Sequence, residues 1–382
     1  MVKKIALLGA TGSIGTSFFE VFAEQKDRLQ LSFVAAHQSY QKLCPPAMRH
    51  GVEMAVLTGI TDLSEQKHIR QSFPQLKLYF GEDELIRLLE NEDYDIGLNA
   101  IGGSSGIEAT FAILKRGKKL ALANKESLVM GGHLVQKLKQ PGQIIPVDSE
   151  HSAIFQALGQ HPLSEVKKLI ITASGGAFRT LPLDEFASIT PAMALKHPNW
   201  DMGAKVTLDS ATMFNKALEV MEAHWLFDLP YDRIEAVIHP QSVIHSLVQF
   251  IDGSLLAQLS SPDMKLPILY ALSYPERWSS ELVQTDLLSH NNLSFQALES
   301  ARYPLYYLGL QVAQAGGIMP TIMNAAAEAA MQLFLAGTIR FTDIHPLVER
   351  TIQAAEQIPD PDLATIIACN KDTFAKTLAL YA

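Results

Sequence analysis

Short apolar runs alternate with amphipathic segments over residues 1–147. A short apolar run indicates a buried strand, and apolar residues at three- and four-residue spacing indicate a helix. The pattern predicts strands at residues 5–8, 31–35, 54–57, 95–100, 120–123 and 144–147. Helical spacing fills most of the gaps, as at residues 12–25, 82–90 and 126–137. Strands that alternate with helices predict an α/β fold with a Rossmann-like, doubly wound parallel sheet.

The pattern changes between residues 148 and 277. Strand candidates at residues 168–173, 234–238, 243–250 and 254–259 predict a mixed or antiparallel sheet with helices packed on it, as in an α+β domain. The stretch 175–203 carries three prolines and no clear period. A loop of that length inside a compact domain is usually a lid or a binding segment.

The pattern of residues 278–382 predicts a linker followed by helices. Residues 278–297 are polar and lack a clear period, which is typical of a linker. Residues 298–382 are rich in Ala and Leu at helical spacing, as at 321–336, and predict a small helical domain. We therefore expect three domains, at residues 1–147, 148–277 and 298–382.

Composition excludes several classes of protein. Lys and Arg total 31 against 40 Asp and Glu, and this net charge of -9 argues against a nucleic-acid or anionic-membrane surface. No apolar run approaches the ~18–20 residues of a membrane span. Cys44 and Cys369 are the only cysteines, so neither a disulfide framework nor a cysteine zinc site is expected. Because the strand pattern begins at Lys3, we expect no signal or transit peptide and either a cytoplasmic location or a mature form.

A glycine-rich loop joins the first predicted strand to the first predicted helix. The segment 9–15 reads Gly-Ala-Thr-Gly-Ser-Ile-Gly, whose glycines permit a tight turn and close approach to a pyrophosphate. This context predicts a dinucleotide site, with an ordinary tight turn as the alternative. The segment 35–39 offers no acid to a ribose 2′-hydroxyl, which favours NADP, with His37 and Ser39 as candidate partners of its 2′-phosphate.

Two carboxylates follow the last predicted strand of the first domain. Asp148 and Glu150 are two residues apart and would point the same way in extended backbone, toward the crevice of a doubly wound sheet. Carboxylate oxygens suit Mg²⁺ or Mn²⁺. The alternative is an acidic helix N-terminus, where a carboxylate is stabilising without a metal.

A second polar group is centred on Lys216. If this region is one helix, Asn215 and Lys216 lie one turn before Glu219, so that Asn and Lys could bind a phosphate and Glu219 could complete a metal site. The alternative is a surface helix with an ordinary Lys–Glu pair, capped by Asp209 or Ser210.

Two further segments offer ligand contacts. Ser174 and the glycines after it follow a predicted strand, where a hydroxyl and exposed N–H groups form a phosphate cradle or a plain turn. The segment 197–203 carries Trp200 and Met202. Exposed apolar side chains lower solubility, so we expect this segment either to close over a ligand or to pack on a neighbouring domain.

Together these stretches resemble the 1-deoxy-D-xylulose 5-phosphate reductoisomerase family of the non-mevalonate isoprenoid pathway. The matching segments occur in the family's order and span nearly the whole chain. They are GATGSIG from Gly9, ANKESLVMGG from Ala123, PVDSEHSAIFQ from Pro146, TASGGAF from Thr172, LKHPNWDMGAKVTLDSATMFNKALEV from Leu195, HPQSVIHSLVQFIDGS from His239 and AQLSSPDMKLPILYALSYPER from Ala257.

The resemblance implies a two-step reaction and assigns residues to it. The ketose phosphate rearranges, by retro-aldol cleavage and re-addition, and NADPH reduces the resulting aldehyde to 2-C-methyl-D-erythritol 4-phosphate. The implied metal ligands for Mg²⁺ or Mn²⁺ are Asp148, Glu150 and Glu219, and the implied catalytic residues are Lys125, Glu150 and His151. The implied substrate contacts are Ser149, Ser174, His197, Trp200, Met202, Ser210, Asn215, Lys216 and Met264. The implied cofactor contacts are Gly9, Thr11, Gly12, Ser13, Ile14, His37, Gln38, Asn124 and Glu126. The family also implies a homodimer.

Three departures from the family pattern qualify these assignments. Ala36, His37 and Gln38 stand where the family usually has Gly, then Arg, Lys or Ser, then Asn, which could reduce the preference for NADP over NAD. Ala217 replaces a usual Gly, and we expect little functional effect because alanine favours a helix. The segment 324–328 has Ala where an Asn is common, which we read as a structural difference.

Other functions fit the sequence less well. A semialdehyde dehydrogenase needs a nucleophilic cysteine in its substrate domain, and neither Cys44 nor Cys369 lies there. A polyol dehydrogenase would not need the phosphate-binding positions. A silent NADP-binding regulator would be marked by loss of a metal carboxylate, and all of these are present.

Overall fold

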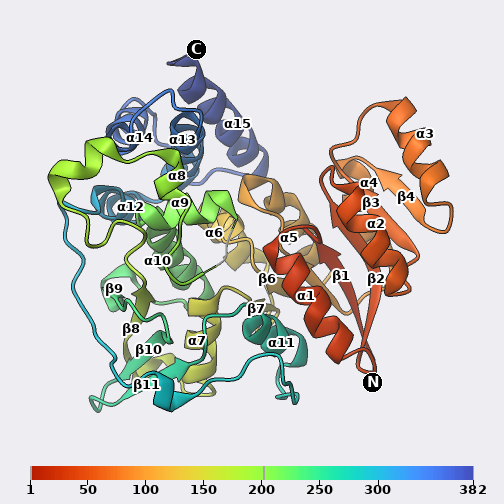
Figure 1. Ribbon diagram of the computed structural model, residues 1–382, viewed down its shortest axis with the longest axis horizontal. Coiled ribbons are helices and arrows are strands. Elements are labelled where there is room, and N and C mark those ends of the chain that lie inside the picture. Colours follow the sequence, from red (N-terminus) through yellow and green to blue (C-terminus); the bar gives the residue numbers. More distant parts are fainter. Residues whose placement is uncertain (1, 201–202, 382) are drawn as a thin grey trace. The chain divides into compact units, whose positions relative to one another are not determined.

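The computed structural model describes residues 2–200 and 203–381 (Figure 1). The chain divides into two compact units, each discontinuous in sequence. Unit 1 comprises residues up to 127, 135–152 and 263–284, and unit 2 comprises 128–134, 153–262 and the residues from 285 onward. The three domains predicted from the sequence were bounded by changes in the pattern of apolar residues, whereas the two units are bounded by the packing of the chain. The predicted bounds therefore stay a prediction. Among the described residues, no helix is both long and apolar enough to cross a membrane.

Unit 1 is built on a seven-stranded parallel sheet with the order β4-β3-β2-β1-β5-β6-β7. This arrangement confirms the predicted doubly wound parallel sheet. Its strands are β1 (Lys3–Leu8), β2 (Leu29–Ala36), β3 (Met54–Leu57), β4 (Lys77–Phe80), β5 (Ile96–Asn99), β6 (Lys119–Leu122) and β7 (Ile144–Pro146). Residues 5–8 of the central strand β1 are fully buried, as expected when helices cover both faces of a sheet.

Strand β4 was not predicted from the sequence, and its position explains why. It lies at the edge of the sheet, and of its residues only Leu78 is buried. A four-residue edge strand that begins with an exposed lysine carries too short an apolar run to be recognised.

Helices follow the strands of unit 1 as the sequence predicts (Figure 1). They are α1 (Ser13–Glu24), α2 (Tyr40–Arg49), α3 (Leu63–Ser72), α4 (Glu82–Asn91) and α5 (Ile107–Lys115), with α11 (Lys265–Ser273) added from later in the chain. Helices α6 (Glu126–Leu138) and α7 (Ser149–Leu158) each contribute residues to both units.

Unit 2 contains a four-stranded mixed sheet and a group of helices. The strand order is β11-β10-β8-β9, with β8 (Val166–Ala173) parallel to β9 (Ile234–Ile238) and antiparallel to β10 (Ile244–Phe250), which in turn pairs antiparallel with β11 (Leu255–Leu259). The mixed sheet predicted from the sequence is thereby confirmed. The helices are α8 (Pro191–Ala194), α9 (Ala204–Ala211), α10 (Phe214–Phe227), α12 (Pro304–Ala315), α13 (Met319–Leu335), α14 (Ile344–Gln353) and α15 (Leu363–Ala379).

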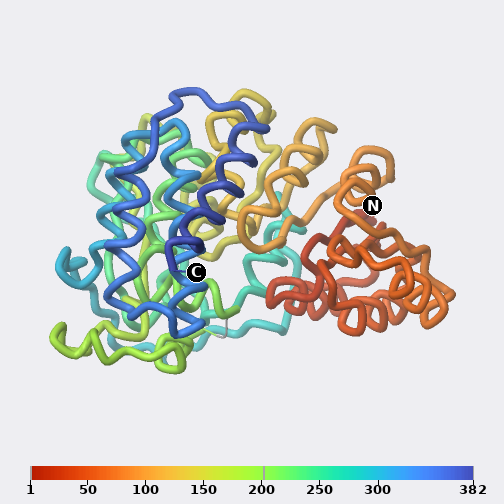
Figure 2. Tube along the Cα trace, turned by 90° about the horizontal axis from the view of Figure 1, so that it is seen from above, coloured from red at the N-terminus to blue at the C-terminus, as the bar shows by residue number. Residues whose placement is uncertain are grey.

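Helix α10 lies between two apolar cores of unit 2. Ala217 and Val220 belong to the core formed with the sheet, whereas Leu218 and Met221 belong to the core formed with the C-terminal helices. Figure 2 shows α12 to α15 running side by side, and α13 contacts each of the other three. A helix that is apolar on most of its circumference is buried on both sides, which fixes the orientation of its few polar residues.

Close packing of α10 on α12 depends on a glycine. A Cβ added to Gly309 of α12 would lie 2.5 Å from the Cβ of Ala217. The methyl group of Ala217 therefore occupies space that Gly309 leaves open.

We predict that Gly309→Ala destabilises the protein and that Ala217→Gly restores stability in the double variant. The single substitution should cost about 1–3 kcal/mol, because extra methyl groups in a packed core force shifts of the backbone. Thermal or urea unfolding of both single variants and the double variant measures the coupling. Additive effects of the two substitutions would contradict this account of the contact.

Candidate active site

The glycine-rich loop of unit 1 has the geometry of a dinucleotide loop. Gly9 has a φ of 78°, and a Cβ there would lie 2.2 Å from the carbonyl oxygen of Ala100. A Cβ at Gly15 would lie 2.4 Å from the backbone of Ala10, so this glycine lets α1 pack closely on the loop. Gly12 meets no such obstacle, and its missing side chain leaves the N-terminus of α1 open to a phosphate.

A cavity of about 360 Å³ opens beside this loop, entirely within unit 1. Of the predicted cofactor residues, it is lined by Gly9, Thr11, Gly12 and His37. Its remaining lining residues are Ala35, Ala36, Thr58, Glu82, Leu85, Ala100, Ile101, Gly102 and Ser105. Ser13, Ile14, Gln38, Ser39, Asn124 and Glu126 do not line it.

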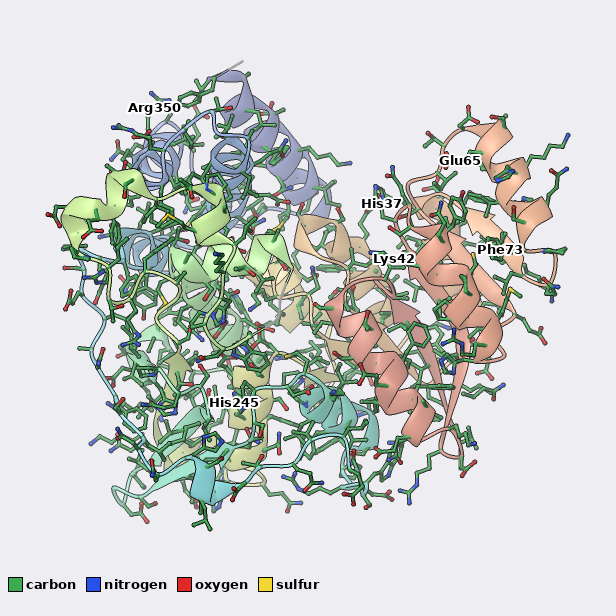
Figure 3. The ribbon with its side chains drawn as sticks, viewed as in Figure 1. His37, Lys42, Glu65, Phe73, His245 and Arg350 are labelled. Atoms are coloured by element: carbon green, nitrogen blue, oxygen red, sulfur yellow. The ribbon has the colours of Figure 1, made fainter. Side chains whose placement is uncertain are left out.

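His37 lines this cavity. It directly follows β2 (Figure 3). Its Nδ1 lies 3.2 Å from the Thr58 hydroxyl, and its ring covers Gly59, where a Cβ would lie 2.3 Å away. Glu82, at the start of α4, also lines the cavity, and sequence reasoning missed it. The described lining residues include no Lys or Arg, and Glu82 is the acidic residue among them.

Asn124 does not line the cavity but holds a residue that does. Its side-chain amide donates to the carbonyl oxygens of Ile101 and Gly103, each at 2.7 Å, and its oxygen accepts the N–H of Ser127 at 3.1 Å. Ile101 lines the cavity, so Asn124 holds the wall in place.

Asp148 is the centre of a charged group at the start of α7. The Lys125 ammonium lies 2.6 Å from one of its carboxylate oxygens, and Nδ1 of His151 lies 3.4 Å from the other. Burial alone would raise the pKa of Asp148, but the Lys125 charge and the His151 hydrogen bond hold that pKa well below its usual range. The carboxyl group is therefore ionised and ready to bind a cation.

Asp148 and Glu150 approach each other through a helix rather than an extended strand. Strand β7 ends at Pro146, and the N–H of Glu150 donates to the Asp148 carboxylate at 3.3 Å in the first turn of α7. The expectation of extended backbone is corrected, yet carboxylate oxygens of the two residues lie within 4.8 Å of each other. The hydroxyl of Ser149 donates to the Glu150 carboxylate.

In unit 2 the predicted helix around Lys216 is in fact two helices. Met213, with a φ of 58°, separates α9 from α10, so the expected single helix is corrected. Asp209 and Ser210 lie in α9 and do not cap α10, whose capping position is Met213. The break places Asn215 and Lys216 in the first turn of a new helix, where the positive end of the helix dipole favours an anion.

The Lys216 ammonium is buried and hydrogen-bonded. It donates to the carbonyl oxygen of Thr172 at 2.6 Å and to the Glu219 carboxylate at 2.5 Å. The other Glu219 oxygen accepts from the Asn215 amide at 2.5 Å. The spacing predicted for a helix is confirmed for these residues, but the pair is buried, with 4% and 1% of the side chains exposed, rather than on the surface.

The loop after β8 packs on the end of α9. Gly175 and Gly176 have φ values of 85° and 70°, and a Cβ at Gly176 would lie 2.5 Å from the carbonyl oxygen of Ser210. These glycines bring Ser174 and Ser210 into one region of unit 2. The Ser174 hydroxyl accepts the N–H of Gly176 at 3.1 Å and lies 3.0 Å from Nε2 of His197.

Three further predicted substrate contacts are Trp200, Met202 and Met264. The Trp200 ring lies 5.8 Å from the ring of His245. His245 belongs to β10 (Figure 3). Met264 is at the start of α11 in unit 1. Met202 lies outside the described residues.

Comparisons with known proteins show which family the chain is similar to. Three family models match the chain: 1-deoxy-D-xylulose 5-phosphate reductoisomerase at residues 5–132, its C-terminal domain at 144–227, and the DXP reductoisomerase C-terminal domain at 259–375. The reductoisomerase of Thermosynechococcus vestitus is 43% identical over 97% of this chain and 91% of its own length. That of Halalkalibacterium halodurans is 43% identical over 98% of each chain.

Solved structures give the same result. The reductoisomerase of Zymomonas mobilis in complex with NADPH is 37% identical, with a TM-score of 0.91 over 100% of this chain and 99% of its own. A reductoisomerase in complex with NADPH, fosmidomycin and magnesium is 35% identical, with a TM-score of 0.93 over 99% of this chain and 98% of its own. Family models, curated relatives and solved structures thus coincide along nearly the whole length, and the chain belongs to the 1-deoxy-D-xylulose 5-phosphate reductoisomerase family.

Proposed function

We propose that this chain converts 1-deoxy-D-xylulose 5-phosphate into 2-C-methyl-D-erythritol 4-phosphate, with NADPH as the reductant and Mg²⁺ or Mn²⁺ as the cation. The observation that carries the proposal is its near full-length likeness to a reductoisomerase in complex with NADPH, fosmidomycin and magnesium. The glycine loop, the ionised Asp148 beside Glu150, and the buried Lys216 supply groups suited to each ligand.

We assign the metal to Asp148 and Glu150 of unit 1 together with Glu219 of unit 2. Three carboxylates form a hard oxygen donor set that fits Mg²⁺ or Mn²⁺. When bound, such a cation supplies electrostatic stabilisation of the oxyanion that develops on the substrate as its carbon–carbon bond breaks. Lys125 and His151 keep Asp148 ionised and oriented, and Ser149 orients Glu150.

We assign the substrate phosphate to the residues gathered at the start of α10 and the end of α9. Ser174, Ser210, Asn215 and Lys216 supply hydroxyl, amide and ammonium donors, and His197 lies beside Ser174. Trp200, Met202 and Met264 complete the proposed substrate contacts. We further propose that the enzyme is a cytoplasmic homodimer, on the strength of its family resemblance alone.

We predict oxidation of NADPH by this protein in the presence of 1-deoxy-D-xylulose 5-phosphate and Mg²⁺, followed by loss of turnover when excess chelator is added. The reason is that the oxyanion developing on the substrate needs the cation for its stabilisation. Nicotinamide absorbance measures the rate, with unphosphorylated 1-deoxy-D-xylulose as the control substrate. A folded protein that binds NADPH and oxidises none of it would overturn the proposed function.

We predict that Lys216→Gln lowers both stability and substrate affinity. Removal of one partner of a buried ion pair leaves the Glu219 charge uncompensated, at a cost of about 3–5 kcal/mol. Chemical unfolding without ligands measures this cost, and the substrate KM reports on the phosphate contact. Lys168→Gln, which breaks the more exposed pair with Glu235 in the same unit, should cost no more than about 1 kcal/mol. Equal losses in the two variants would contradict the buried pairing.

We predict that Glu82→Gln strengthens the binding of NADPH more than that of NADH. A carboxylate in a cavity without a lysine or arginine opposes the 2′-phosphate, which only NADPH carries. We expect a dissociation constant for NADPH that is about threefold to tenfold lower, and little change for NADH. Nicotinamide fluorescence titration measures both constants without turnover, and the neighbouring Asp83→Asn is the control because Asp83 does not line the cavity. Equal changes for the two cofactors would exclude this role for Glu82.

A further inference from the structure

The imidazole of His197 is held in one protonation state by its backbone neighbours. Its Nδ1 accepts the N–H of Asn199 at 3.2 Å and the N–H of Trp200 at 2.9 Å. A ring nitrogen that accepts hydrogen bonds carries no proton, so the proton of the ring lies on Nε2. Nε2 is 3.0 Å from the Ser174 hydroxyl oxygen and therefore donates to it.

This arrangement sets the hydrogen bonding of the Ser174 hydroxyl. The oxygen accepts from Nε2 of His197 and from the N–H of Gly176. Both of its acceptor positions are then in use, and its own hydrogen is left to donate. A neutral His197 thus prepares Ser174 as a donor for an anionic ligand.

The side chain of Asn199 ties this segment to the turn between β9 and β10. Its amide donates to the carbonyl oxygen of Pro240 at 2.7 Å and to the Ser242 hydroxyl at 2.8 Å. Both amide hydrogens are used, so the contact fixes the orientation of the side chain. Ser242 has a φ of 53°, a left-handed conformation that aims its hydroxyl toward the segment.

The turn is itself fastened to the strand that carries Ser174. The N–H of His239 donates to the carbonyl oxygen of Ala173 at 2.7 Å, one residue before Ser174. The ring of His239 is stacked on Phe295 at 4.9 Å, and its Nδ1 lies 2.9 Å from the carbonyl oxygen of Ser294. Hydrogen bonds and backbone therefore form a closed ring that runs from Ser174 through His197, Asn199 and the turn back to Ala173.

We propose that Asn199 is a positioning residue for phosphate recognition: it anchors the segment 197–200 to the β9–β10 turn and so holds His197 with its Nε2–H on Ser174. The phosphate ligand rests on the proposed function, whereas the anchoring rests on the described contacts alone. Asn199 acts through His197 and Ser174 and has no direct part in the reaction.

The first test is the tautomer of His197 in the protein without ligands. Selective ¹⁵N-histidine labelling distinguishes protonated from unprotonated ring nitrogens, and a His197→Gln variant assigns the signal. We expect a single Nε2–H tautomer in the unaltered protein and a mixture of tautomers in Asn199→Ala. An unchanged His197 signal in Asn199→Ala would overturn the proposal.

The second test is the affinity for phosphate. In Asn199→Ala, the inhibition constant of inorganic phosphate and the KM for the sugar phosphate substrate should both rise by roughly tenfold, since a displaced donor weakens ground-state binding, while kcat stays within about threefold. A fall in kcat with unchanged KM and phosphate inhibition would contradict a positioning role.

Two further variants separate anchoring from general damage to the fold. Ser242→Gly removes one acceptor of the Asn199 amide and suits the left-handed backbone, so it should shift the same readouts in the same direction even if Asn199→Ala folds poorly. Ser188→Ala removes a local hydrogen bond to Glu185 in the same loop and should leave the readouts unchanged. Equal effects of Ser188→Ala and Ser242→Gly would overturn the anchoring role. If the protein lacks reductoisomerase activity but the His197 tautomer still responds to Asn199→Ala, the proposed function fails and the anchoring stands.

Discussion

Burial of the Lys216 ammonium is the constraint on which the arrangement of unit 2 depends. A charge this far from water is stable only with several close partners, and Lys216 finds them in the Thr172 carbonyl and the Glu219 carboxylate. Thr172 lies on β8 and Glu219 on α10 itself, so the hydrogen bond from Lys216 to Thr172 joins the helix to the sheet. The apolar sides of α10 supply the rest of the packing energy, since they are enclosed by the sheet core and the helical core.

The same principle operates on a smaller scale in unit 1. Asp148 is stabilised as an anion by Lys125 and His151 at the start of α7. In both units a charged group suited to ligand binding is held by partners of opposite charge or by hydrogen-bond donors before any ligand arrives. Preorganisation of this kind lowers the cost of ordering side chains on binding.

Much of this could be predicted from the sequence because the strongest signals are periodic. The parallel sheet of unit 1, the mixed sheet of unit 2 and the close spacing of Lys216 and Glu219 all follow from apolar runs or helical spacing. The break before α10 could not be predicted, because Met213 adopts a left-handed conformation without the glycine or asparagine that usually marks one. Glu82 was missed for another reason: it reaches the cofactor cavity only through the order of the strands, which a local pattern does not contain. The helical approach of Asp148 to Glu150 was misjudged because a two-residue spacing fits a strand and a helix start equally well.

The contact between Ala217 and Gly309 links two segments that are far apart in the chain. A side chain larger than hydrogen fits at only one of these positions, so they must be inherited as a compatible pair. During divergence, the order of substitution matters, because the position that loses a methyl group has to change first. C-terminal helices that carry a residue larger than glycine at the position of Gly309 can therefore replace those of this protein only when the facing residue on α10 travels with them.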